Sequence, residues 1–529
     1  MEHALAPMVP AIALALIVLA VTALGRRLPI PTPILQVVAG LMVGLAPGAA
    51  AFRLDPSVVF FVFLPPVLWA AAYFTSFRDF RANARPIGLL AIGLVIATTA
   101  LVAIVARALL PGLPWAAAVA LGAIVSPPDA VAAEAILKQL PVPRRIVVIL
   151  QGESLVNDAS ALVLYRTAVV AAVSGTFSLG ETIVRFFVDA AVGILIGLAV
   201  GWLLIRLARV TRDSLAEAIL SLLGPYIAWV AAGSLHVSAV LACVAGGLYV
   251  RQHYSSAVSP ASRIQTRAVW DLLLFVMNAL IFLLLGVQFG ELMEAVPAET
   301  LGSVARTGVI LSLLAIAIRL VWVPLGTWLP RLMSAAVRRR EAAPSNRGVF
   351  LVGWTSMRGI VSLASAMSLP VMLNNGRPFP YRAEIVLITM CVIVITLVVQ
   401  GLSLAPLIRR LKFPGDHSER DEEMHARRET IRHALEKIDD LSDEPWVRAE
   451  DAEHLREEYR RQARSHHAEA TGTADHGHAR RRLRAEVLRA ERRSLIRLRD
   501  EGAISDEVLH HLERELDVEA LRIGDGETR

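Results

Sequence analysis

The chain has 529 residues, of which 55% are hydrophobic and 19% are charged, and its mean hydropathy is +0.55. These values exclude one long soluble fold and indicate a membrane protein with many spans and a polar appendage. The net charge of +6 does not indicate nucleic-acid binding, because most basic residues lie in loops between apolar segments or in the tail, where membrane topology explains them. The two cysteines, Cys243 and Cys391, lie in apolar runs, so neither a disulfide framework nor a thiol metal site is expected.

Hydropathy predicts about thirteen membrane spans. The N-terminus lacks the basic region of a secretory signal, so we expect the first span to be retained, with the N-terminus outside the cell. Arginine-rich loops alternate with loops that hold few basic residues, which places the arginine-rich loops and the tail on the cytoplasmic side of the cell inner (plasma) membrane. The expected spans are 8–24, 32–48, 56–74, 86–110, 114–138, 144–173, 180–208, 215–233, 236–251, 267–290, 303–330, 348–373 and 384–411.

Two of these spans are interrupted at their centres. The fifth contains Pro127 and Pro128, which do not fit an unbroken helix. The twelfth contains the polar, glycine-bearing stretch Gly353-Trp-Thr-Ser-Met-Arg-Gly359. The first of these is the fifth of the first six spans, and the second is the fifth of the last six spans. Broken helices at corresponding positions of two halves indicate a transporter built from inverted repeats.

The middle of the sixth span reads Gln151-Gly-Glu-Ser-Leu-Val-Asn-Asp-Ala-Ser160. Asp158 falls near the bilayer midplane, because a helix rises 1.5 Å per residue and a span needs about 20 residues. Glu153 and Asn157 share one helix face, and Ser154 and Asp158 share the adjacent face. A carboxylate at this depth costs on the order of a few kcal/mol and usually handles ions or protons. We therefore interpret the cluster as an ion site, with a buried hydrogen-bond network as the alternative.

Three further charges lie at mid-depth. Asp129 is at the break of the fifth span and Arg358 at the break of the twelfth, where their charges would offset the exposed helix ends. Arg319, near the middle of the eleventh span, needs a buried anion because a guanidinium stays protonated. We expect Glu153 to be this anion, with Asp158 as the alternative. We interpret both arginines as structural charges rather than substrate ligands.

A charged, helical tail follows Phe413. Residues 414–529 are expected to form two or three amphipathic helices, either as a small cytoplasmic domain or as a dimer contact. One helix is expected to start at Ser505. A stretch with four histidines is interpreted as a solvated linker rather than a pH sensor or metal site. These histidines are His466, His467, His476 and His478.

Three motifs follow one another along the chain: Ser126-Pro-Pro-Asp129, Gly152-Glu-Ser-Leu-Val-Asn-Asp-Ala159 and Met357-Arg-Gly359. They resemble the motifs of the monovalent cation:proton antiporter 1 family, the sodium/proton exchangers. The resemblance covers essentially all of 8–411. It implies an all-α polytopic fold with two crossed discontinuous helices, and a homodimer in a lipid membrane that needs no cofactor. It divides an antiporter domain, 1–413, into a scaffold near 8–74 and 215–290 and a moving core near 86–173 and 303–411.

The resemblance also implies roles for individual residues. Asp158 would bind a sodium ion and a proton in turn. Asn157 matches the amide of the Asn-Asp pair in electroneutral exchangers, Ser154 would offer an oxygen ligand, and Asp129 would complete or shape the site. The expected ion- and proton-binding set is therefore Asp158, Asn157, Ser154 and Asp129. The family's structural ion pair matches Glu153 and Arg319.

The resemblance predicts secondary active exchange of sodium or lithium for protons, one for one, by alternating access. Potassium/proton exchange is the first alternative, and a cation channel is a weaker one. Family members often have an aspartate after the Leu-Pro-Pro motif of the third span, whereas this chain has Ala70, which leaves the preferred cation open. An enzyme is not expected, because no Ser/His pairing lies at mid-depth.

Overall fold

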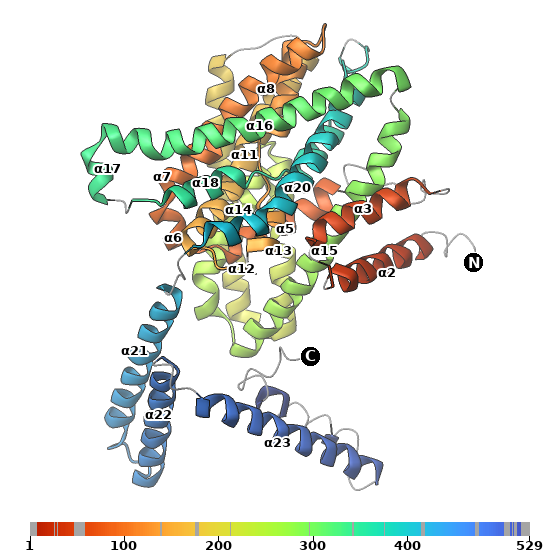
Figure 1. Ribbon diagram of the computed structural model, residues 1–529. Coiled ribbons are helices and arrows are strands. Elements are labelled where there is room, and N and C mark those ends of the chain that lie inside the picture. The colour runs from red at the N-terminus through yellow and green to blue at the C-terminus, as the bar shows by residue number, and fades with distance from the viewer. Residues whose placement is uncertain are drawn as a thin grey trace. The chain divides into compact units, whose positions relative to one another are not determined.

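The computed structural model divides into two compact units, Met1–Asp416 and His417–Arg529. Every regular element in the described part of the chain is a helix, as Figure 1 shows, which confirms the all-α fold class. The described residues are 8–25, 27–28, 30–46, 59–137, 140–174, 179–211, 213–295, 297–340, 343–374, 376–413, 418–470, 475–501, 508–509, 512 and 516–519.

The helices of the first unit follow the expected spans closely. Seven described helices are long and apolar enough to cross a membrane, so the protein is a multi-pass membrane protein, while the total of thirteen spans stays a prediction. The elements are α2 (Met8–Gly25), α3 (Thr32–Gly44), η2 (Val59–Phe63), α5 (Leu64–Phe74), α6 (Phe77–Ala82), α7 (Ala84–Gly88), η3 (Leu89–Leu94), α8 (Val95–Leu109), α9 (Trp115–Val125), α10 (Ala130–Leu137), α11 (Arg144–Ser174), α12 (Leu179–Thr211), α13 (Ser214–Ser234), α14 (Ala239–Ala257), α15 (Pro260–Ala295), α16 (Ala298–Met333), α17 (Ala335–Arg340), α18 (Asn346–Trp354), α19 (Ile360–Met367) and α20 (Arg382–Leu411).

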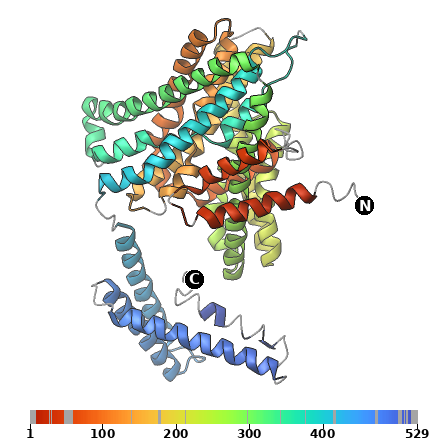
Figure 2. The same cartoon turned by 45° about the vertical axis from the view of Figure 1, so that its right-hand side comes forward.

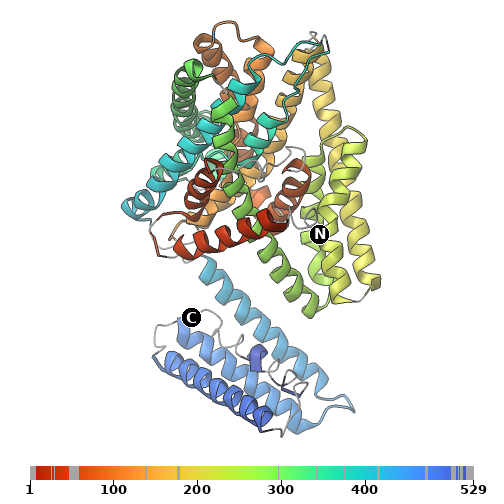
Figure 3. The same ribbon diagram turned by 90° about the vertical axis from the view of Figure 1, so that its right-hand side faces the viewer.

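Two groups of helices pack tightly within this unit. In one, α12, α13 and α14 pack on one another, α14 on α5, and α13 on α15, which also lies along α3. In the other, α9 packs on α8 and α11, and α16 packs on α8, α18 and α20. Figures 2 and 3 show α12 to α15, in yellow and light green, side by side. The seventh expected span, which corresponds to α12, therefore packs with the first group.

Glycines allow the closest of these contacts. A Cβ atom on Gly40 of α3 would lie 1.9 Å from the Leu283 carbonyl oxygen of α15. A Cβ on Gly197 of α12 would lie 2.1 Å from the Ala242 carbonyl oxygen of α14. Small residues let helix backbones approach in this way inside membranes, where packing rather than hydrophobic burial drives association.

The second unit contains α21 (Ser418–Leu441), α22 (Ala449–Ala470) and α23 (Asp475–Asp500). The Arg456 guanidinium of α22 donates to the Asp439 carboxylate of α21 at 2.8 Å. The linker interpretation of the four histidines is wrong, because two lie in α22 and two in α23. The alanine, glutamate and arginine residues beside these histidines have a high helix propensity, which outweighs the low helix propensity of the short Gly/Thr stretch. Ser505 lies outside the described residues.

Candidate functional site

The two expected breaks are present. α9 ends at Val125 and α10 begins at Ala130, while α18 ends at Trp354 and α19 begins at Ile360. The intervening prolines lack the N–H groups that would continue α9. The breaks also touch each other, because the Asp129 N–H donates to the Met357 carbonyl at 2.6 Å.

The Asp129 carboxylate lies at the N-termini of two half-helices. Its Oδ1 accepts a hydrogen bond from the Val131 N–H at 2.8 Å, so it caps α10. Its Oδ2 lies against the residue that precedes α19, since a Cβ built on Gly359 would be 1.6 Å from that oxygen. One negative charge therefore serves the positive ends of both α10 and α19.

Two guanidinium groups lie at the opposite ends of the breaks. Arg358 donates from Nε to the carbonyl of Val125, the last residue of α9, at 3.0 Å. Arg319 donates from Nε to the Val352 carbonyl in the last turn of α18, also at 3.0 Å. Each cation thus satisfies a carbonyl at the negative end of a half-helix.

Arg319 also forms a buried ion pair with Glu153 of α11. Its Nη2 donates to Glu153 Oε2 at 2.6 Å, and its Nη1 donates to Oε1. Both side chains are 1% exposed. This bidentate contact fixes the orientation of the guanidinium. Because Glu153 neutralises Arg319, the Asp158 carboxylate is available for another role.

Asn157 connects α11 to the first break. Its Nδ2 donates to the Pro128 carbonyl at 2.9 Å, which satisfies an oxygen that the break removes from the helical pattern. The Asn157 side chain is fully buried, and it is not among the residues that line the nearby cavity.

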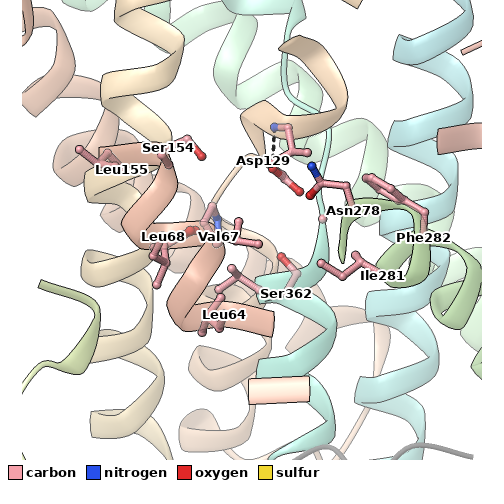
Figure 4. A pocket seen from close by; sticks show the side chains of 16 residues that line it. Leu64, Val67, Leu68, Asp129, Ser154, Leu155, Asn278, Ile281, Phe282 and Ser362 are labelled. Atoms are coloured by element: carbon pink, nitrogen blue, oxygen red, sulfur yellow. Dashed lines mark hydrogen bonds between the residues drawn. The ribbon is translucent and has the colours of Figure 1, made fainter. Parts of the chain in front are cut away.

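A cavity of about 50 Å³ lies beside the breaks. Figure 4 shows its lining side chains, and the lining residues come from α5, the first break, α10, α11, α15, the second break and α19. This space is large enough for an ion or a few water molecules. Asp158 faces it with 8% of its surface exposed. The polar lining residues are Asp129, Ser154, Asp158, Asn278 and Ser362.

Two of these polar residues were not predicted. Asn278 lies midway along α15, and Figure 4 shows its amide pointing toward the Asp129 carboxylate. Ser362 of α19 is buried, and its hydroxyl has no hydrogen-bond partner among the described residues. A search for isolated polar residues at the centres of apolar spans would have found Asn278. Ala71, and not the buried Ala70, lines the cavity where the family's acidic residue was expected.

Comparisons with known proteins identify the family. Residues 12–410 match the transmembrane family of sodium/hydrogen exchangers. The chain belongs to this family. It is 34% identical to an uncharacterized Na(+)/H(+) exchanger of Mycobacterium tuberculosis, with 97% of this chain and 96% of the relative covered. It is 33% identical to the sodium, potassium, lithium and rubidium/H(+) antiporter of Bacillus pumilus, over 78% of this chain and 63% of that protein.

A solved structure supports the same fold. The sodium proton antiporter of Methanocaldococcus jannaschii superposes with a TM-score of 0.60 at 18% identity, covering 78% of this chain and 99% of that chain. The family model over residues 12–410 and the 34% identical relative confirm the predicted family membership. The protein is a cation/proton exchanger of this transporter family.

Proposed function

We propose that this exchanger moves sodium or lithium ions against protons, one for one, by alternating access at Asp158. The observation that carries the proposal is the convergence of two broken helices on a small cavity that contains Asp129 and Asp158. Two carboxylates with serine oxygens suit a hard monovalent cation, which prefers oxygen ligands. Asp158 is the proposed cation ligand, with Ser154 and Asp129 beside it.

Competition for one carboxylate explains the coupling. A proton and a cation each neutralise Asp158, and both cannot occupy the same oxygen atoms. The empty carboxylate carries its charge through the low-dielectric core, which costs on the order of a few kcal/mol. Only the loaded states therefore cross readily, so each cation moved in one direction is matched by a proton in the other, and the opposing gradients drive the cycle.

The structural charges hold the site in shape. We propose that Glu153, Arg319 and Arg358 maintain the crossed breaks by satisfying the ends of α9 and α18. Asn157 is proposed to position the first break through its bond to the Pro128 carbonyl, rather than to contact the cation. The proposed topology places the tail in the cytoplasm and the N-terminus outside. The proposed scaffold of a homodimer is formed by the helices near 8–74 and 215–290.

Asn278 is proposed to supply an oxygen ligand from α15, on the scaffold side of the cavity. Replacing Asn278 with leucine should raise the sodium concentration for half-maximal exchange by about three- to tenfold, because one polar contact contributes on the order of 1 kcal/mol. The maximal rate should change less. The matched control is Gln265→Leu, the same amide-to-apolar change at an exposed position of α15. Unchanged sodium dependence in a folded Asn278→Leu protein would remove Asn278 from the ligand set.

Gly359→Ala should disturb the Asp129 carboxylate directly, because the new methyl group would overlap its Oδ2. We expect exchange to fall by about tenfold or more, and the loss of the α10 cap to lower stability by on the order of 1 kcal/mol. Proton flux in vesicles and thermal melting measure the two effects. Gly302→Ala in α16 is the control, since nothing lies within 4 Å of a Cβ there. Normal exchange by Gly359→Ala would show that the Asp129 position is not critical.

The proposed function is tested in proteoliposomes. Sodium, lithium and potassium gradients are applied separately, and the internal pH is recorded with the membrane potential clamped at zero and then varied. Sodium- or lithium-driven proton movement that does not respond to the potential supports one-for-one exchange. Equal or faster potassium-driven movement would establish the potassium alternative, which the name of the Bacillus pumilus relative keeps open. Cation flux without proton counterflow would indicate a channel.

A further inference from the structure

A second cavity, of about 230 Å³, lies among α7, η3, α11, α16 and α18. Among the residues that the structure describes, it shares no lining residue with the cavity at Asp158. One part of its wall is apolar and includes Leu89, Ile149, Trp322 and Val349. The Trp322 indole N–H donates to the Leu89 carbonyl at 3.1 Å, so the polar edge of the ring is satisfied within the protein. This part of the cavity is suited to a hydrocarbon chain.

The other part of the wall is strongly basic. Arg85, Arg145 and Arg331 line it, and no lining residue that the structure describes is acidic. A guanidinium has five N–H donors, so a bond within the protein, such as that from Arg145 Nε to the side-chain Oδ1 of Asn83 at 3.1 Å, is compatible with a second bond to a ligand. This part of the cavity is suited to an anion.

The first turn of α18 borders the same basic region. Ser345 caps this helix by accepting from the Gly348 N–H at 3.1 Å, and both residues line the cavity. The positive end of α18 therefore adds to the three arginines in favouring a negative group.

The cavity adjoins a surface that suits the lipid phase. Leu325, Leu329 and Leu332 of α16 are exposed apolar side chains, and they are interleaved along the helix with the lining residues Gly326 and Arg331. A membrane helix with such a stripe faces acyl chains. Bilayer acyl chains would therefore lie beside the wall that α16 contributes to the cavity.

We propose that this cavity binds an anionic phospholipid, with its phosphate at the three arginines and the α18 N-terminus and an acyl chain along Trp322 and Ile149. Basic pockets between membrane helices are typical sites for anionic headgroups. The deep wall reaches Val352, whose carbonyl accepts the bond from Arg319. A bound lipid thus contacts the half-helix that Arg319 holds in place, and its presence should stabilise this arrangement of α16 and α18.

The test measures lipid binding to the purified full-length protein, and it therefore does not depend on the proposed exchange. Native mass spectrometry counts bound phosphatidylglycerol against phosphatidylcholine, and thermal melting is followed with each lipid. Two variants target the two parts of the cavity: Arg85→Ala/Arg145→Ala removes charge, and Gly326→Leu fills the apolar part. Among the described residues, a Cβ at Gly326 meets only Leu89 Cδ1, at 3.8 Å, so the leucine side chain has room to extend into the cavity. The control, Arg78→Ala/Arg81→Ala, removes two arginines that line a different surface hollow.

The proposal predicts selective retention of phosphatidylglycerol by the wild type and the control. It predicts at least tenfold weaker binding, and loss of the melting-temperature increase, in both targeted variants. Normal binding by Gly326→Leu would overturn the insertion of an acyl chain. Equal binding of phosphatidylcholine would overturn selection by charge. Displacement of the lipid by millimolar inorganic phosphate alone would show that the site recognises a free anion instead.

Discussion

Asp158→Asn is expected to abolish exchange while the protein stays folded. Asparagine has nearly the same size as aspartate, but it neither titrates nor neutralises a cation. Transport should fall at least a hundredfold, because each half of the cycle uses the same carboxylate. The melting temperature should stay the same or rise, since a buried carboxylate is costly to keep in a membrane. Proton flux in proteoliposomes and thermal melting in detergent measure the two effects.

The control for this prediction is another acidic residue in the membrane unit. Asp271 of α15 is exposed and bonds to Arg267 at 3.2 Å, so Asp271→Asn should exchange ions normally. An Asp158→Asn protein that melts like the wild type and still exchanges cations for protons would contradict the role given to Asp158. The cation would then have to use Asp129 or another site.

The second large effect is expected at the Glu153–Arg319 pair. Glu153→Gln leaves the buried guanidinium without its counter-charge, and breaking a buried pair from one side costs about 3–5 kcal/mol. The variant should therefore unfold at much lower temperature or denaturant concentration. Removing both charges in Glu153→Gln/Arg319→Met should recover part of this loss, because no uncompensated charge then remains. Unfolding of the purified proteins, with Arg319→Met alone completing the cycle, measures the coupling.

The exposed pair of Arg267 and Asp271 provides the comparison here too. Its removal should cost less than about 1 kcal/mol, because water screens both charges. If the double change at Glu153 and Arg319 were as destabilising as the sum of the two single changes, the residues would act independently. That result would remove the ion pair as a support of the α18 end.

The sequence predicted the features that depend on local chemistry. Two consecutive prolines remove two helical N–H donors, so the interruption at Pro127 and Pro128 was readable without knowledge of the fold, although single prolines lie inside α13, α16 and α20. Glu153 and Arg319 both lie at mid-membrane, where an unpaired charge has a high free-energy cost. Their pairing could therefore be inferred although they are 166 residues apart in the sequence. The family resemblance then supplied the division into scaffold and core and the roles of the site residues.

Features that depend on helix rotation could not be predicted in this way. Whether Ala70 or Ala71 faces the cavity is decided by how α5 packs on its neighbours, since adjacent residues on a helix point about 100° apart. Asn278 and Ser362 are single polar residues without a periodic pattern, so only the packing of α15 and α19 brings them to the cavity. The π-helical turns η2 and η3 likewise have no clear signal in the sequence.

The most direct test of competition at Asp158 is proton release on sodium binding. Purified protein in weakly buffered detergent solution is titrated with sodium chloride, and the pH is followed with an indicator dye, with choline chloride as the ionic-strength control. The account predicts that the wild type releases protons in proportion to the sodium bound, less at high pH where Asp158 is already deprotonated, and that Asp158→Asn releases none. Sodium binding to the wild type without proton release at any pH would contradict it.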